Sequence, residues 1–143
     1  MAIKAFTELP EDFHFLEAES TSEGFKFLVK MKAEWESGKN RFDKPGEKVF
    51  GIFDQGKLVA IGGINIDPYA GDTSIGRVRH LYVLRSYRRQ QLGANLIAEI
   101  VRFGAQNFTK LRLRTDTVAA AKFYEKIGFK AVEDSSASHE WTF

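Results

Sequence analysis

Residues 115–129 read Thr-Asp-Thr-Val-Ala-Ala-Ala-Lys-Phe-Tyr-Glu-Lys-Ile-Gly-Phe, and this stretch is the most informative part of the chain. Apolar residues recur at helical spacing at Ala120, Phe123 and Ile127, which predicts a helix over residues 118–127. Gly128 is suited to end this helix, because glycine adopts a left-handed conformation without steric cost. The three alanines at 119–121 leave a thin face that a ligand or a strand can approach closely. These features alone also describe an ordinary packed helix.

A second informative stretch, residues 78–97, reads as a strand that runs through a short basic loop into a helix. The first backbone N–H groups of a helix have no partner within it, and the positive end of its dipole lies there, so this junction is suited to bind a phosphate. Gly93 lets the backbone approach a bulky anion, and Ala94 keeps that approach narrow. Arg88 and Arg89 add positive charge and fork-shaped donors. The alternative is a strand followed by an ordinary basic helix start.

Charge is concentrated around this junction rather than spread along the chain. Thirteen residues without an acid, 77–89, contain five arginines: Arg77, Arg79, Arg85, Arg88 and Arg89. The formal net charge of the whole chain is only +2, which does not indicate a nucleic-acid partner. The basic stretch favours a phosphorylated small molecule or a solvated face, and its composition does not distinguish between these two interpretations.

The rest of the chain predicts alternating strands and helices. A short strand over residues 3–6 precedes a helical pattern that begins near Pro10 and breaks at residues 20–22. A second helix is expected over about residues 23–37, with Ser22 as its N-cap and Gly38 as its end. Further strands are expected at residues 49–53, 58–66, 74–83, 110–115, 129–132 and 140–143, and further helices at 92–103 and 118–127. This order predicts an α/β chain with a mixed sheet flanked by helices, in a single domain over residues 1–143.

Several chemistries are excluded by composition. The 143 residues include no cysteine, so a disulfide framework, a thiolate nucleophile and a cysteine-bound zinc are all impossible. The three histidines, His14, His80 and His139, are far apart in the sequence and lack the spacing of metal ligands. No apolar run approaches the roughly 20 residues of a membrane span, and the N-terminus lacks the apolar core of a signal peptide. A cytoplasmic protein without a membrane or metal partner is therefore expected.

The two informative stretches together resemble motifs of the GNAT superfamily of N-acetyltransferases. Motif A of that family, Gln/Arg-x-x-Gly-x-Gly/Ala, matches residues 88–93, with Gln91 at the position of the first glycine. Motif B, Asn-x-x-Ala-x-x-Phe-Tyr followed by Gly-Phe, matches residues 117–129 without a gap, with Thr117 in place of the asparagine. The resemblance extends over essentially the whole chain and implies the GNAT fold, a mixed but mostly antiparallel sheet of about six or seven strands flanked by about four helices.

The resemblance implies that acetyl-CoA is the cosubstrate and that its acetyl group passes directly to a primary amine. The residues that match the family's cofactor site are Leu81, Val83, Arg88, Arg89, Gln91, Leu92, Gly93, Ala94, Thr117, Ala120 and Phe123. The main chain of the strand around Leu81 and Val83 would pair with the pantetheine arm. The Val83 N–H would then stabilise the oxyanion of the reacting thioester. Tyr124 matches the family's general acid toward the CoA sulfur, although a tyrosine that only packs its ring remains an alternative.

The general base is harder to assign. Many relatives use a glutamate on the strand before motif A, and residues 73–98 contain no acid. His80 is the candidate base, because it titrates near neutral pH and by period two shares a strand face with Val78 and Tyr82. A histidine that is only packed in the structure is the alternative.

The acceptor side is expected near residues 62–72. The glycine pair Gly62-Gly63 indicates close approach by a ligand or a backbone. Asn65, Asp67 and Tyr69 are candidate substrate-binding residues, since a carboxylate there could hold a cationic amine, and a plain turn is the alternative. The acceptor is expected to be a small-molecule or protein amine, and relatives of this kind often form homodimers. A second functional hypothesis is a CoA-binding sensor or partner module without catalysis, favoured by Gln91, Thr117 and the missing glutamate.

Overall fold

A single seven-stranded sheet runs through the computed structural model, which describes all residues, 1–143. The strands are β1 (Ala2–Phe6), β2 (Lys48–Asp54), β3 (Lys57–Ile66), β4 (Ile75–Val83), β5 (Lys110–Leu113), β6 (Lys130–Ala131) and β7 (His139–Thr142). Their order in the sheet is β1-β2-β3-β4-β5-β7-β6, and only the β4–β5 pair is parallel. The four helices are α1 (Phe13–Ser22), α2 (Phe27–Ser37), α3 (Leu92–Gly104) and α4 (Val118–Ile127). The expected mixed and mostly antiparallel sheet with four helices is confirmed.

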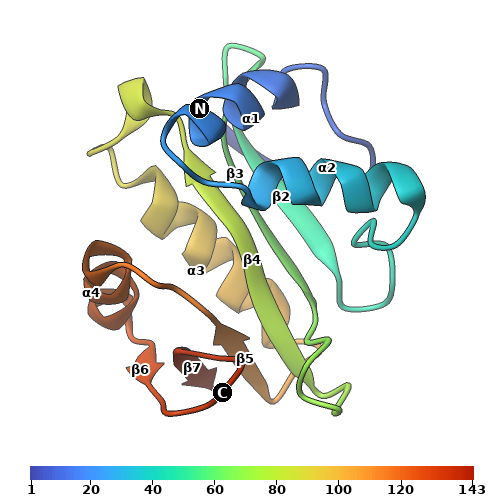
Figure 1. Cartoon of the computed structure of the whole chain (residues 1–143), viewed down its shortest axis with the longest axis vertical. Helices are drawn as coiled ribbons and strands as arrows, with labels where there is room; N and C mark the ends of the chain where they lie inside the picture. The colour runs from blue at the N-terminus through green and yellow to red at the C-terminus, as the bar shows by residue number, and fades with distance from the viewer.

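The helices divide between the two faces of the sheet (Figure 1). Two adjacent glycines of β3 show this division, because consecutive strand residues point to opposite faces. A Cβ on Gly62 would lie 3.2 Å from Ile100 of α3, whereas a Cβ on Gly63 would lie 3.0 Å from the Phe42 ring on the side of α1 and α2. Both glycines therefore make room for core side chains. Neither glycine lines the cleft described below, so the expected approach of a ligand or a backbone at this pair is replaced by the close packing of core side chains.

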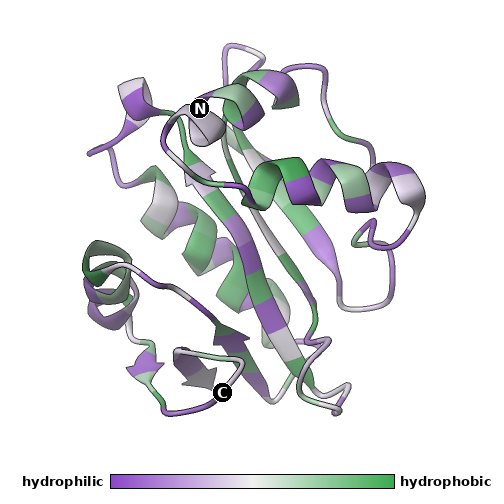
Figure 2. Cartoon of the chain, in the orientation of Figure 1, coloured by the Kyte–Doolittle hydropathy of each residue, from purple (hydrophilic) through white to green (hydrophobic).

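The core follows from the apolar pattern of the central strands. Residues 58–65 of β3 are all buried, as expected for a strand that is covered on both faces. Hydrophobic and hydrophilic residues alternate along much of β4, where one face packs on α3 and the other carries arginines (Figure 2). The most strongly amphipathic helix, α3, buries Leu96, Ile97 and Ile100 against the sheet. No helix is long and apolar enough to cross a membrane.

A β-bulge in the middle of β4 determines which side chains face the two helix layers. Ile61 pairs with Tyr82 and Gly63 pairs with Arg79, so Gly62 alone lies opposite two β4 residues. His80 is one of these two residues, and it adopts a left-handed conformation with φ of 62°, which accommodates the bulge.

The bulge overturns part of the predicted face pattern. His80 and Tyr82 both lie on the α2 side, where each contacts the Phe27 ring. Val78, however, pairs with Ile64, whose side chain packs against α3. Because residues paired directly across two strands share a face, Val78 lies on the face opposite His80. The expected period of two is broken by the inserted residue.

The first two helices also differ from the prediction. Residues 20–22 were expected to break the helical pattern, but they form the last turn of α1, and the break falls at residues 23–26. Ser22 is therefore not the N-cap of the following helix. Its hydroxyl instead donates to the backbone carbonyl of Glu19, a bond that serine makes readily within a helix. Gly38 ends α2 as expected, with φ of 80°.

Candidate active site

A cleft of about 1200 Å³ opens between the edge of β4 and the helix α4. It exists because β4 and β5 pair only over their first three residues, from Ile75↔Lys110 to Arg77↔Arg112. Beyond Arg77 the two strands separate, which is visible in Figure 1 where β5 accompanies only one end of β4. The edge of β4 from residue 78 to 83 therefore has no strand partner on this side. Its backbone groups are available to an extended ligand, in the manner of strand addition.

The loop before α3 closes one end of the cleft with backbone amides. Arg89 and Gln91 both adopt the left-handed conformation, with φ of 66° and 61°. Turns of this kind direct successive N–H groups toward an anion, and the first amides of α3 add to them. Gln91 is the N-cap of α3, and its side chain makes no cap hydrogen bond. The residue that replaces the family's first glycine thus takes a glycine-like conformation.

Gly93 joins the two sequence motifs at one point in space. A Cβ at Gly93 would lie 3.3 Å from the Phe123 ring of α4 and 3.8 Å from a methyl group of Val83 on β4. A Cβ there would press on the Phe123 ring and touch Val83 at ordinary contact distance. Predicted cofactor-site residues from β4, from the loop, from α3 and from α4 all line this one cleft: Leu81, Val83, Arg88, Arg89, Gln91, Leu92, Gly93, Ala94, Thr117, Ala120 and Phe123.

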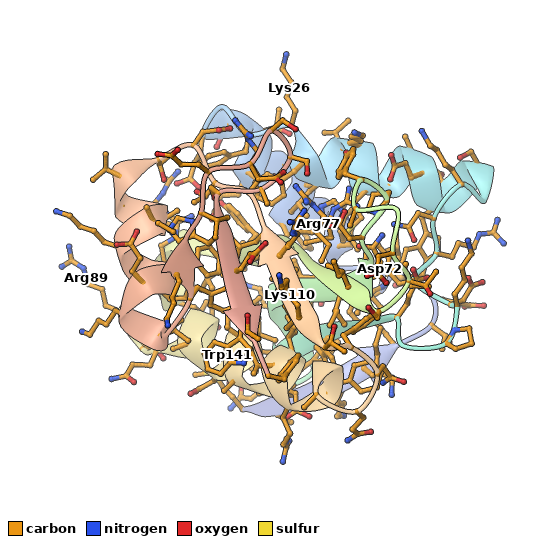
Figure 3. All side chains as sticks on the ribbon, turned by 90° about the horizontal axis from the view of Figure 1, so that it is seen from below. Lys26, Asp72, Arg77, Arg89, Lys110 and Trp141 are labelled. Atoms are coloured by element: carbon orange, nitrogen blue, oxygen red, sulfur yellow. The ribbon has the colours of Figure 1, made fainter.

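The five arginines of the basic stretch separate into paired and unpaired groups. Arg77 is buried, 3.3 Å from Asp67, and it also donates to the carbonyl of Ser136 at 2.7 Å. Arg85 and Arg88 both pair with Glu23. Arg79 and Arg89 make no ion pair or side-chain hydrogen bond. Arg89 points away from the body of the molecule, while Arg77 lies within it (Figure 3).

Glu23, which no motif in the sequence indicates, holds the residues before α3 to the end of α1. Its carboxylate accepts from Arg88 at 2.7 Å and from the Tyr82 hydroxyl at 2.6 Å. These hydrogen bonds, with that of Arg88 first, lower the pKa of the Glu23 carboxyl to about 2. Arg88 is thereby committed to Glu23 and to the Val83 carbonyl, and its expected role as a free phosphate ligand is weakened. Nothing in the local sequence around Glu23 indicates contacts with residues more than 55 positions away.

Tyr124 forms part of the cleft wall opposite β4. Its ring is held edge-on between Phe123 and Phe129, and only 8% of the residue is exposed. Burial raises the pKa of Tyr124 above its ordinary value, so the phenol keeps its proton throughout the physiological range. Its hydroxyl makes no hydrogen bond with the protein. A protonated hydroxyl that is not engaged with the protein is suited to donate to a ligand atom.

Thr117 has a structural task in addition to its place in the cleft. Its hydroxyl oxygen accepts from the Ala120 N–H at 3.1 Å and so caps the N-terminus of α4. The asparagine expected at this position in the family would be an equally good cap. The substitution therefore preserves the helix start.

His80 lies in the cleft wall, but its chemistry differs from the expectation. Its ring stacks on Phe27 and meets the Phe42 ring edge-on. Burial lowers the pKa of His80 to about 3, and the charges of Arg79 and Lys30 act in the same direction. The buried Nε2 has no hydrogen-bond partner. A neutral imidazole with so low a pKa is a weak base, and this observation favours the packed alternative.

The three predicted acceptor residues are not brought together in the cleft. Asp67 has no exposed side-chain surface and is engaged by Arg77 and by the Tyr69 N–H. Asn65 is buried and does not line the cleft. Tyr69 does line it, with its ring 4.8 Å from the Arg77 guanidinium carbon. The Asp67 carboxylate is not free to hold a cationic amine, because the buried Arg77 neutralises it.

Comparison with known proteins identifies the family that this architecture represents. Residues 45–131, more than half of the chain, match the family model of the acetyltransferase (GNAT) domain. The chain belongs to the GNAT acetyltransferase family.

Solved structures agree with this assignment. A protein from Exiguobacterium sp. 255-15 that is assigned as an acetyltransferase is 25% identical, with a TM-score of 0.84 over 99% of this chain and 94% of that one. The ribosomal-protein-alanine N-acetyltransferase of Brucella melitensis has the same fold at 15% identity, with a TM-score of 0.72 and full coverage of both chains. A Bacillus anthracis str. Ames protein assigned as a streptothricin acetyltransferase was solved with acetyl coenzyme A. It is 19% identical, with a TM-score of 0.58 over 71% of this chain and 65% of that one.

The cleft of this GNAT acetyltransferase fits acetyl-CoA on its own geometry. Backbone amides at the start of α3 suit the pyrophosphate, and the unpaired edge of β4 suits an extended amide-bearing arm. Because Gly93 has no side chain, the start of α3 can lie close to Phe123 of α4 and to Val83 of β4. No group of three or more His, Cys, Asp or Glu side chains is placed to hold a metal ion.

Proposed function

We propose that this GNAT acetyltransferase transfers the acetyl group of acetyl-CoA directly to a primary amine. The observation that carries the proposal is the cleft in which an unpaired β4 edge, the amide-rich start of α3 and the hydroxyl of Tyr124 face one ligand site. Each of these three features serves a different part of a thioester substrate. An alternative use would have to explain why all three occur together.

In this proposal, acetyl-CoA binds mainly to backbone groups of β4 and of the start of α3, and less to the arginine side chains. The amides near Gln91, Leu92 and Gly93 surround the pyrophosphate, and the helix dipole of α3 favours its negative charge. Arg89, which is exposed and unpaired, supplies additional positive charge. The unpaired edge of β4 holds the pantetheine amides by hydrogen bonds, and Val83 ends this edge beside Gly93.

The transfer step needs a free amine, a polarised carbonyl and a protonated leaving group. The amine nitrogen attacks the thioester carbon, so that a C–N bond forms, the C–S bond breaks and the amine releases one proton. The Val83 N–H donates to the carbonyl oxygen as negative charge develops on it. The Tyr124 hydroxyl donates its proton to the departing sulfur, and the tyrosine regains a proton from solvent.

In this proposal the acceptor enters the site as the free amine, having lost its proton in bulk solvent. Asp116, the one carboxylate that lines the cleft, pairs with Arg114 and is largely exposed. The pKa of His80, about 3, is far below that of an ordinary amine, and proton transfer to it is strongly uphill. His80 therefore shapes the wall of the site, and only the fraction of the amine that is already unprotonated in solution reacts.

The second candidate function is a CoA-binding module without catalysis. The lack of a basic carboxylate and the low pKa of His80 favour it. The Tyr124 hydroxyl, which makes no hydrogen bond with the protein, favours catalysis instead.

Two measurements on one sample separate these functions. Acetyl-CoA at one hundred times its Kd should raise the free energy of unfolding by about 2.7 kcal/mol, read as a rise in Tm. Thiol release over a panel of amines then reports turnover. Stabilisation with turnover supports the proposal, and stabilisation without turnover supports the binding module. No stabilisation would overturn both functions.

A matched pair of variants tests where the ligand binds. Gly93→Val places methyl groups against Phe123 and Val83 and should abolish the acetyl-CoA shift. Ala98→Val adds the same methyl groups on an exposed position of α3 and should leave the shift unchanged. Equal shifts in both variants would place the ligand elsewhere.

A further inference from the structure

The half of the cleft that lies beyond the bulge of β4 differs in character from the half that suits acetyl-CoA. It is lined by the aromatic rings of Phe25, Phe27 and Tyr69 and by the cations Lys30 and Arg79. No aspartate or glutamate lines it. This half is the space that remains for the acceptor if acetyl-CoA occupies the start of α3 and the edge of β4.

Arg79 is the distinctive group in this region. It extends from β4 beside the bulge, on the same face as Gly63, whose neighbours belong to the α1 and α2 side. It is the one arginine of the 77–88 segment without an ion pair or side-chain hydrogen bond. Burial lowers the pKa of Arg79, and the charge of Arg77 acts in the same direction. A partly buried guanidinium without an anion is costly, so an anion that binds there gains free energy from its neutralisation.

The nearby acids do not satisfy Arg79. The charges of Glu34 and Asp67 act on it, but neither lies within ion-pair distance. Asp67 is engaged by Arg77, and Glu34 lies 4.0 Å from the Lys30 ammonium. The Lys30 side chain is 60% exposed and its separation from Glu34 is long for an ion pair, so Lys30 is free to move toward a ligand. Two cations therefore face the acceptor space with no carboxylate on its wall.

We propose that the acceptor is a small primary amine that also carries an anionic group, a carboxylate or a phosphate, held by Arg79 and Lys30. This inference rests on the proposed acetyltransferase function and names the substrate class of the same site. The guanidinium binds an oxyanion through two parallel N–H donors, which fixes the orientation of the acceptor. The same cations repel polyamines and other acceptors whose only charges are positive.

Matched amines test the charge preference directly. Glycine, β-alanine and γ-aminobutyrate are each compared with their carboxamides, and phosphoethanolamine is compared with ethanolamine. We expect kcat/KM to be at least tenfold higher for the anionic member of one or more pairs. The pair with the largest ratio distinguishes carboxylate from phosphate and gives the spacing from amine to anion. Equal or lower values for every anionic member would overturn the inference while leaving acetyl transfer intact.

Variants connect the preference to Arg79. Arg79→Met keeps the length of the side chain without its charge and should abolish the preference, so that kcat/KM for each anionic amine falls to that of its neutral partner. Arg79→Lys should restore part of the preference. Arg102→Met, an exposed arginine of α3 outside the cleft, is the control and should behave as wild type. A preference that persists in Arg79→Met would also overturn the inference.

Binding provides a readout that does not depend on turnover. Calorimetric titration of the CoA-saturated protein with N-acetylglycine, N-acetyl-β-alanine, N-acetyl-γ-aminobutyrate and N-acetylphosphoethanolamine should show binding of at least one. Arg79→Met should weaken that binding at least tenfold. If no amine is acetylated, the proposed function fails, and the same titration still decides whether Arg79 binds an anion. Equal affinity in both proteins, or no binding to either, would reject the anion site.

Discussion

Tyr124 combines a buried ring with a hydroxyl that makes no hydrogen bond with the protein, in the wall of the cleft. Its raised pKa keeps the proton on the phenol, so the hydroxyl is available as a hydrogen-bond donor to the departing sulfur. The change Tyr124→Phe should lower kcat about 100-fold and leave the acetyl-CoA KM within about twofold, because it removes only the proton donor. Steady-state kinetics with acetyl-CoA as the varied substrate gives both values. An unchanged kcat would remove Tyr124 from the mechanism.

Gln91 shows how one residue can depart from a motif and still preserve its geometry. Its φ of 61° is the conformation that glycine adopts freely and that costs other residues about 1–2 kcal/mol. We expect Gln91→Gly to raise the free energy of unfolding by up to about 1 kcal/mol, because the strain is relieved. Urea denaturation measures this change.

A neighbour in the same loop is the control for Gln91. Gln90 does not have a positive φ, so Gln90→Gly should instead lower stability by about 0.5–1 kcal/mol through the added freedom of the unfolded chain. Acetyl-CoA affinity is measured in both variants. Tighter binding in Gln91→Gly alone would show that the Gln91 side chain crowds the ligand, and equal affinity would show that the loop already accommodates it.

At the scale of the elements, α4 depends on its cap. The Thr117 hydroxyl accepts from the Ala120 N–H, so Thr117→Ala should lower the free energy of unfolding by about 1 kcal/mol. Thr117→Ser keeps the acceptor and should cost less. The exposed Thr73, which makes no side-chain hydrogen bond, provides a control in Thr73→Ala. Equal losses in Thr117→Ala and Thr73→Ala, measured by urea denaturation, would contradict the capping role.

The central element is β4, because its two irregularities create the site. Its separation from β5 after Arg77 leaves an edge for a ligand, and its bulge places His80 on the α2 side beside Arg79. The cleft therefore has one half beside the start of α3 and another beside α2. Under the proposed function, acetyl-CoA and the acceptor would occupy these two halves.

At the scale of the whole molecule, Glu23 connects the end of α1 to Arg85 and Arg88, which lie before α3. Its pKa is lowered from 4.5 to about 2, so its stabilising contribution is fully present above pH 4.5 and is lost as the pH falls toward 2. We expect Glu23→Gln to lower the free energy of unfolding by about 1–2 kcal/mol at pH 7, allowing for the solvent that screens Arg85 and Arg88. The exposed Glu36, which has no ion pair, gives the control Glu36→Gln. The deficit should shrink below pH 4.5 in urea denaturation, and a pH-independent deficit would contradict this account.

The pH dependence of turnover reports on the proton path of the complete enzyme. Because the pKa of His80 is about 3, it is neutral throughout the range from pH 5 to 9. We expect kcat/KM to rise with pH until the pKa of the acceptor amine is reached, without an inflection near 6.5. Acceptors with different amine pKa values should shift the curve accordingly. An inflection near 6.5 that vanishes in His80→Phe would restore His80 as the base.

Much of this protein is determined by short-range patterns in its sequence. The motifs at residues 78–94 and 117–129 predicted the GNAT fold and the residues that line the cleft through their resemblance to that family, and the periodicity of the whole chain predicted the order of the elements. Such patterns succeed because helical and strand periodicity, a glycine stop and an amide-rich helix start depend on residues within a few positions of one another.

The tertiary structure alone decided how the charges and faces are used. The contact of Glu23 with Arg88 joins residues 65 positions apart, and it removes Arg88 from the set of free phosphate ligands. The buried Asp67 is paired with Arg77, and burial lowers the pKa of His80. A single inserted residue in β4 places Val78 and His80 on opposite faces of the sheet. Arg79, in contrast, was left unpaired beside the acceptor space. Ion pairing, desolvation and strand register depend on which distant segments meet, and no local pattern specifies that.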